Sequence, residues 1–239
     1  MIFVLCALLT LVGLVFAPGP PTAADRSLEF GDSAQGRDLH TSRIGPRDAE
    51  RTVLVVGSIH GDETEGHEIV ERLRDESPAR VTIWLVRSVN PDGVAGDTRK
   101  NAHGVDLNRN FPIDWQASSD SSSGYYPGGK PLSEPESRAV IRLTKWIDPD
   151  LVVWYHQPWN QVLGSCTGPD RVQRRYAQLT GMEFACRGGE LPGTATKWLN
   201  RKPGRKAFVV ELAAGELSSS AAARHARAVV SLAHRTGRR

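Results

Sequence analysis

The stretch TVLVVGSIHGDETE, residues 52–65, decides the fold expected for this chain of 239 residues. It begins as an apolar run typical of a buried strand and changes abruptly to a small polar loop that carries His60 and Glu63. Open α/β sheets place their sites at the carboxyl ends of strands, and a histidine nitrogen and a carboxylate are both zinc ligands. A catalytic zinc site needs a third protein ligand and keeps one position open for water. The loop therefore predicts two zinc ligands and raises the question of where the third lies.

Strands and helices are expected to alternate along the rest of the chain. An edge strand or hairpin is expected within residues 27–44. Buried apolar runs predict strands at residues 53–56, 81–86, 151–155 and 206–212. Amphipathic patterns and start signals predict helices at residues 64–75, 133–147, 170–180 and 218–234. This alternation predicts a three-layer α/β/α sandwich with a mixed, largely parallel central sheet.

Two further local features are expected within this arrangement. Ser133, with Pro135 and Glu136 after it, has the pattern of a capping box that opens a helix. The long segment 93–129 is rich in Gly, Ser and Asn and is expected to be a functional loop, because long irregular loops in compact domains usually are.

The N-terminal residues predict export. Residues 2–17 are almost all apolar and are followed by small residues up to Ala24, which predicts a signal peptide at 1–24 and a secreted or cell-envelope location. The run is shorter than the ~20 residues of a membrane span, so no stable span is expected. No Lys or Arg precedes the run, which leaves an uncleaved anchor as the alternative. The remaining 25–239 have the length and composition of a single domain.

Charge and cysteine content indicate which partners and which covalent links to expect. The net charge of +3 comes partly from the basic tail at 235–239, and no basic stripe is interleaved with aromatic residues, so nucleic acid is not expected as a partner. Cys6 would be lost with the signal peptide. Cys166 and Cys186 then predict a disulfide in an exported chain, with two free buried thiols as the alternative.

Three predicted strands end in residues that suit metal chemistry. The first ends at His60 and Glu63, the next at His156, and the last at Glu211 within FVVELAAG. Two histidines and a carboxylate form the zinc set of metallopeptidases, and a further carboxylate can act as general base. The other histidines are expected on the surface: His40, His67, His103, His225 and His234.

An ordered set of motifs resembles the zinc carboxypeptidase family, and within it the short bacterial branch of murein peptide amidases and γ-D-glutamyl-meso-diaminopimelate peptidases. The motifs are HGDE at 60–63, NPDG at 90–93, RKNAHGVDLNRNFP at 99–112, YYPGGKPLSEPE at 125–136, WYHQ at 154–157 and VVEL at 209–212. They cover nearly the whole chain after the predicted signal peptide. The resemblance implies the zinc carboxypeptidase-like sandwich fold.

The resemblance also implies a metal centre with one zinc per chain. Its ligands would be His60, Glu63 and His156. Asp106 would accept the other ring proton of His60 and fix the orientation of that ligand.

The remaining roles that the resemblance implies concern the substrate. Arg99 would stabilise the oxyanion that develops on the scissile carbonyl. Asn108 and Arg109 would hold the terminal carboxylate of the substrate. Glu211 would be the general base that later protonates the leaving amine. The family's tyrosine on a mobile loop before the catalytic glutamate has no match here, because no tyrosine lies between Tyr176 and Glu211.

The function expected from these residues is an exported zinc metallocarboxypeptidase. Its substrate would be a peptide with a free C-terminal carboxylate, with cell-wall murein peptides suggested by analogy alone. One alternative is a zinc-dependent deacylase of N-acyl amino acids, of the aspartoacylase or succinylglutamate desuccinylase type. Another is a non-catalytic peptide-binding relative, which the missing tyrosine alone favours.

Overall fold

A mixed sheet of eight strands forms the centre of the protein in the computed structural model, which describes residues 27–165, 167–186 and 191–234. The strand order is β1-β2-β4-β3-β5-β8-β6-β7. The bounds are β1 (Ser27–Asp32), β2 (Asp38–Ile44), β3 (Thr52–Val56), β4 (Thr82–Val86), β5 (Leu151–His156), β6 (Trp159–Gly164), β7 (Glu183–Cys186) and β8 (Lys206–Ala213). The central strands β4, β3, β5 and β8 run parallel to one another, whereas β1, β2 and β6 pair antiparallel with their neighbours β2, β4 and β8.

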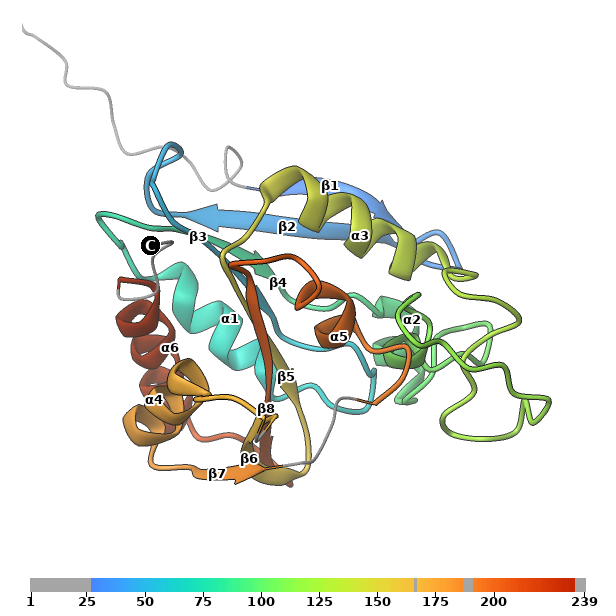
Figure 1. Ribbon diagram of the computed structural model, residues 1–239. Helices are drawn as coiled ribbons and strands as arrows, with labels where there is room; N and C mark the ends of the chain where they lie inside the picture. The colour runs from blue at the N-terminus through green and yellow to red at the C-terminus, as the bar shows by residue number, and fades with distance from the viewer. Residues whose placement is uncertain (1–26, 166, 187–190, 235–239) are drawn as a thin grey trace, which may run out of the picture.

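Helices cover both faces of this sheet (Figure 1). On one face lie α1 (Gly66–Arg74), α4 (Arg171–Thr180) and α6 (Ser219–Ala233), and on the other lie α3 (Pro135–Ile147) and α5 (Ala195–Leu199). The short helix α2 (Pro91–Gly96) and the 3₁₀ turn η2 (Leu107–Arg109) lie in the long connection between β4 and α3. The predicted three-layer sandwich with a mixed, largely parallel sheet is confirmed.

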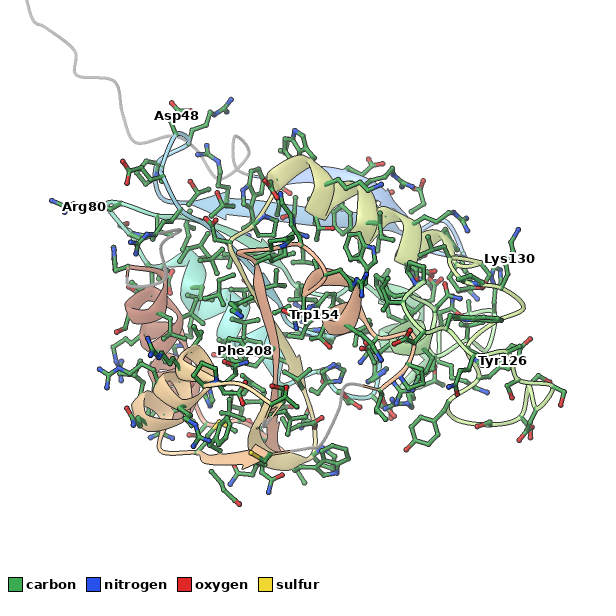
Figure 2. All side chains as sticks on the ribbon, viewed as in Figure 1. Asp48, Arg80, Tyr126, Lys130, Trp154 and Phe208 are labelled. Atoms are coloured by element: carbon green, nitrogen blue, oxygen red, sulfur yellow. The ribbon has the colours of Figure 1, made fainter. Side chains whose placement is uncertain are left out.

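Successive side chains along each central strand point to opposite faces of the sheet and pack into two separate apolar cores. In β3, Val55 joins the core under α1, α4 and α6, whereas Leu54 joins the core under α3 and α5. Trp154 of β5 and Phe208 of β8 lie near the centre of Figure 2 and belong to opposite cores. Both faces of the central strands are thus buried, which explains why these strands read as continuous apolar runs.

The signal peptide predicted at residues 1–24 lies outside the described residues, so export stays a prediction, as does the single domain over 25–239. None of the helices within 27–165, 167–186 and 191–234 has the length and apolar character needed to cross a membrane.

Four short elements were not expected from the sequence. No strand was expected between residues 155 and 206, yet β6 and β7 extend the sheet there. Their residues are largely exposed or half-buried, so they lack the apolar run that marks the inner strands. The five-residue helix α5 was not expected at all, and NPDG forms the start of α2, where the side chain of Asn90 accepts a hydrogen bond from Gly93 N.

The capping box expected at Ser133 is wrong. The N-cap of α3 is Glu134, with no capping hydrogen bond from its side chain, and Ser133 Oγ instead donates to Glu134 Oε1 at 2.7 Å. Glu136 is fully buried and accepts hydrogen bonds from Ala34 N at 2.8 Å and Asn101 Nδ2 at 3.1 Å. These two carboxylates therefore anchor distant segments of the chain and are not available to the helix end.

The predicted disulfide concerns one described and one undescribed cysteine. Cys186 ends β7, opposite Gly164 of β6, and is disulfide-bonded. Cys166 lies outside the described residues, so the pairing of the two stays a prediction.

A buried histidine on each of two helices contradicts the expected surface positions. His67 of α1 and His225 of α6 are only 5% and 4% exposed. His67 Nε2 lies 2.9 Å from Ser58 Oγ, and His225 Nδ1 lies 2.7 Å from the hydroxyl of Tyr176. Hydroxyl partners from other parts of the chain make the burial of these two imidazoles possible. The other described histidines named above are exposed: His40, His103 and His234.

Glycine at position 61 is required by a close approach of two backbones. A Cβ on Gly61 would lie 1.9 Å from the carbonyl carbon of Gly93, and Gly61 N donates to Thr98 O at 3.0 Å.

We predict that Gly61→Ala lowers the free energy of unfolding by about 2 kcal/mol, because the backbone segments at Gly61 and Gly93 must move apart. The melting temperature should fall by roughly 4–8 °C. Gly129→Ala, where a Cβ would meet no atom within 4 Å, is the matched control. Equal melting temperatures for both variants would contradict this prediction.

The two buried histidines predict a loss of stability in acid. Burial, aided by Arg87 for His67 and Arg224 for His225, lowers the pKa of each to about 4. Their contribution is complete above the unfolded pKa of ~6.5 and is lost as the pH falls toward 4, because the unfolded chain then binds protons that the folded chain does not.

Denaturant unfolding between pH 7 and pH 4 measures this effect. Each histidine should contribute up to about 3 kcal/mol to the decline. His67→Gln and His225→Asn replace the imidazoles by amides that do not titrate and should flatten the curve over this range. His40→Gln, at an exposed position, should leave the slope unchanged. An unchanged slope in the first two variants would show that other groups cause the acid sensitivity.

Candidate functional site

The candidate site lies at the carboxyl ends of three neighbouring parallel strands. The loop after β3 carries His60 and Glu63, β5 ends at His156, and β8 carries Glu211. His156 and Glu211 are register partners in adjacent strands, so their side chains leave the sheet on the same face, toward α3 and α5. The ends of β3, β5 and β8 that carry these residues therefore lie side by side at one edge of the sheet.

Three side chains meet closely enough to hold one metal ion. The ligand atoms of His60, Glu63 and His156 all lie within 4.8 Å of one another, and all three residues are buried. Glu63 bridges the two rings: its Oε1 is 2.9 Å from His60 Nδ1 and its Oε2 is 2.8 Å from His156 Nδ1. Two imidazole nitrogens and one carboxylate thus point at one shared position.

The contacts around His60 indicate which ring nitrogen faces the metal position. Arg99 Nη1 carries only N–H donors and lies 3.2 Å from Nδ1, so this nitrogen presents its lone pair. The opposite nitrogen, Nε2, is 3.0 Å from Asp106 Oδ1 and donates to it. The Nδ1 lone pair then faces the Oε1 of Glu63 at 2.9 Å, and a metal cation at this position would bind both acceptors. This donor set fits zinc, which takes histidine nitrogen and carboxylate oxygen.

Buried carboxylates control the ionisation of the site. Burial alone would raise the pKa of Glu63, but hydrogen bonds with His156 and His60 outweigh burial and hold that pKa well below its usual range. Asp106 behaves alike, since His60 and Arg99 outweigh burial and lower its pKa. Burial opposes protonation of His60 too, yet the neighbouring carboxylates of Asp106 and Glu63 raise the pKa of the ring. Asp106 contacts the ring nitrogen that faces away from the metal position, where a carboxylate partner fixes the orientation of a histidine ligand.

Arg99 ties the metal ligands to the loop that follows α2. Its Nη1 donates to Glu63 Oε1 at 3.0 Å and its Nη2 donates to Asp106 Oδ2 at 3.0 Å. The two carboxylates outweigh burial and raise the pKa of the guanidinium, so it stays charged. A positive charge is thereby fixed directly beside the metal position.

Asn108 and Arg109 lie in the 3₁₀ turn that Asp106 caps. Asp106 Oδ1 accepts a hydrogen bond from Asn108 N at 2.9 Å. Asn108 Oδ1 accepts from Ala195 N at 3.0 Å, so the amide group of this side chain offers its N–H donors to a ligand. Burial and the nearby Arg99 lower the pKa of Arg109, whose side chain is 14% exposed. The structure thus places Asn108 and Arg109 in one turn, with Arg109 close to Arg99, and their role in binding a carboxylate stays a prediction.

Gln157 is a site residue that the strand-end argument did not single out. Its backbone N donates to Glu63 Oε2 at 3.2 Å, and its side chain accepts from Glu65 N at 3.1 Å and donates to Ala213 O at 3.1 Å. One residue thus joins the end of β5, the HGDE loop and the end of β8. Its position directly after His156 in WYHQ was the available signal.

Comparison with known proteins agrees with this geometry. A family model described as zinc carboxypeptidase matches residues 24–163, which is more than half of the chain. The chain belongs to the zinc carboxypeptidase family. Murein peptide amidase A of Escherichia coli K12 is 35% identical over 154 residues, covering 58% of this chain and 64% of the relative. The match therefore spans slightly less than two thirds of that relative.

Solved structures show the same architecture. The murein-tripeptide amidase MpaA of Escherichia coli O157 superposes with a TM-score of 0.69 at 28% identity, covering 87% of this chain and 91% of that chain. Carboxypeptidase A of Helicoverpa armigera has a TM-score of 0.74 at 20% identity, covering 88% and 68%, which is a likeness of fold. The family uses one zinc, and the donor set of this zinc carboxypeptidase relative suits that ion.

Glu211 lies beyond the residues that the family model matches. Its place in the site depends instead on β8, which pairs with β5 along six register partners from Leu151–Lys206 to His156–Glu211. Glu211 is 6% exposed, so a buried carboxylate is held beside the second histidine. The pairing of β8 with β5 thus supports Glu211 as a residue of the candidate site independently of the family model.

Replacement of Asp106 by asparagine tests how the site holds metal. We predict that Asp106→Asn weakens zinc binding by about 10–100-fold, because the neutral amide removes the charge that orients His60 and pairs with Arg99. Zinc dissociation constants from competition with a chelator measure the effect. Asp48→Asn, on the turn between β2 and β3, controls for loss of a surface carboxylate. Equal zinc affinity in the two variants would show that Asp106 does not support the ligand.

Proposed function

We propose that this zinc carboxypeptidase relative hydrolyses the amide bond next to a C-terminal residue that bears a free carboxylate. The observation that carries the proposal is that Asp106 contacts both the metal triad, through His60, and the two arginines Arg99 and Arg109. This carboxylate is bonded to His60 of the metal triad and to Arg99, and its Oδ2 lies 4.0 Å from Arg109 Nη1. A metal position and a pair of guanidinium groups therefore lie at a fixed separation, as cleavage beside a terminal carboxylate requires.

The substrate would be oriented by its terminal carboxylate. Arg109 and the amide of Asn108 would hold this group, since a guanidinium offers paired N–H donors to a carboxylate. Arg99, nearer to the triad, would stabilise the negative charge that develops on the carbonyl oxygen. Binding at one end of the substrate would thus position the bond to be cleaved.

Proton transfer would fall to Glu211. The zinc held by His60, Glu63 and His156 would supply a Lewis acid and lower the pKa of water to ~7. Glu211 would take a proton from the attacking water and deliver it to the leaving nitrogen. Asp106 and Gln157 would keep His60 and Glu63 in place through the hydrogen bonds described above.

Murein peptides are the substrate class that we propose. The similarity to murein peptide amidase A over 58% of the chain and to the murein-tripeptide amidase structure over 87% of it supports this choice. The apolar residues 2–17 support export to the cell envelope as part of the same proposal. The bond between γ-D-glutamate and diaminopimelate is the specific target proposed.

Activity and metal content of the Glu211→Gln variant test this function. We predict about one zinc per chain in both proteins and release of diaminopimelate from L-alanyl-γ-D-glutamyl-diaminopimelate by the unaltered protein. The kcat of the variant should be lower by ~10²–10⁴-fold, because general acid and base catalysis is lost. Glu216→Gln, at an exposed position five residues later, should keep full activity.

The same assay separates the alternatives. Cleavage of N-acyl amino acids without cleavage of the tripeptide would favour a deacylase. Bound zinc without turnover of either class would favour a peptide-binding relative. Full activity in Glu211→Gln would remove Glu211 from the mechanism.

A further inference from the structure

An exposed tyrosine lies over both arginines of the site. The Cζ atoms of Arg99 and Arg109 are 5.1 Å and 5.3 Å from the ring centroid of Tyr125, within the range of cation–π interactions. The residue is nevertheless 61% exposed, so much of the side chain remains open to contact with a ligand. A single aromatic ring thus contacts the two cations to which carboxylate binding and oxyanion stabilisation are assigned.

The backbone that carries Tyr125 is held from the site side. Tyr126, whose position in the long loop Figure 2 labels, accepts a hydrogen bond at its O from Asp106 N at 2.8 Å. Pro127 O accepts from Asn110 Nδ2 at 2.8 Å. Tyr125 N itself donates to Ser123 Oγ at 3.2 Å. The first two bonds tie the backbone directly after Tyr125 to Asp106 and Asn110, which flank the turn that contains Asn108 and Arg109.

The two arginines need such a partner because their charges repel one another. Arg99 is bonded to Glu63 and Asp106, whereas Arg109 has a distant ion pair with Asp106 at 4.0 Å and donates to its neighbour's carbonyl, Asn108 O, at 2.7 Å. The negative face of an aromatic ring attracts a guanidinium and leaves the N–H edge free for hydrogen bonds. Tyr125 therefore reduces the repulsion without occupying the donors.

We propose that Tyr125 is a positioning residue that holds Arg99 and Arg109 together through its ring and thereby sets the preference for a free terminal carboxylate. The inference rests on the proposed function and adds a specificity determinant to it. The ring, not the hydroxyl, carries the effect. Replacement by phenylalanine should then preserve the preference, and replacement by alanine should remove much of it.

Binding of a matched pair of ligands tests this role apart from catalysis. The pair is L-alanyl-γ-D-glutamyl-L-lysine with a free C-terminal carboxylate and the same peptide with a C-terminal amide. Titration calorimetry uses the zinc-loaded protein carrying Glu211→Gln, which should bind without turnover. In this background, Tyr125→Ala should weaken binding of the acid about tenfold and of the amide less than about twofold, because two cation–π contacts are lost.

Two further variants complete the design. Tyr125→Phe should bind both ligands within about twofold of the Glu211→Gln parent. Trp146→Ala removes a ring of similar exposure, 62%, that packs against Trp84, and should leave both affinities unchanged. In the catalytically active protein, Tyr125→Ala should raise KM about tenfold and change kcat little, since ground-state binding is affected.

The outcomes separate this inference from the proposed function. Equal binding of acid and amide by the parent would overturn carboxylate recognition and this inference with it. A preference for the acid that survives Tyr125→Ala would overturn the role of Tyr125 alone. Equal losses in Tyr125→Phe and Tyr125→Ala would overturn stacking as the cause, because the hydroxyl would then carry the effect.

Discussion

The buried carboxylate of Asp106 is the constraint on which the rest of the site depends. It is fully buried, and an ionised carboxylate in such a place is tolerated only when it is paired and hydrogen-bonded. Its partners are His60 Nε2, Asn108 N and the guanidinium of Arg99. Each partner comes from a different functional group of the site, so one side chain fixes the metal ligand, the turn of the carboxylate-binding pair and the charged arginine.

The same principle organises the long irregular connection between β4 and α3. This segment has little regular structure, so buried side chains must satisfy its backbone groups. Asn110 Nδ2 donates to Pro127 O and to Lys130 O, and Asn101 Nδ2 donates to both Glu134 and Glu136. The motifs of this connection are therefore structural anchors as well as sources of site residues, which explains why Glu136 is not used to cap α3.

The central sheet and the convergence of strand ends could be predicted from sequence because a strand buried on both faces appears as a local run of apolar residues. Strands β3, β5 and β8 are buried on both faces and read as apolar runs, and the polar residues that end them stand out. The last two strands at one end of the sheet lack such runs: β6 and β7 are largely exposed or half-buried, and β7 has only four residues. The burial of His67 and His225 depends on hydroxyl groups from other parts of the chain, which the pattern of a single helix does not encode.

The roles of the site residues also differ in how far the sequence alone could predict them. His60, Glu63 and His156 could be proposed from their strand-end positions alone, whereas Arg99 and Asp106 needed the resemblance. Their functional meaning comes from contacts across the site, such as Arg99 with Glu63 at 3.0 Å. Tyr125 begins one of the motifs that carry the resemblance but received no role from it, because its contacts with two arginines depend on the path of an irregular loop. Local patterns thus indicate ligands, and only the folded loop indicates what surrounds them.

The balance of charge in the site gives a physical reason for the proposed substrate class. With Glu211 ionised, as its proposed role requires, Glu63, Asp106 and Glu211 carry one more negative charge than Arg99 and Arg109 carry positive charge. A divalent cation reverses this balance to a single positive charge within a buried environment. One carboxylate of a ligand then restores neutrality, and an amide or ester at the same place does not. Because uncompensated charge is costly away from water, the metal-loaded site should favour a ligand with one anionic group near the arginines.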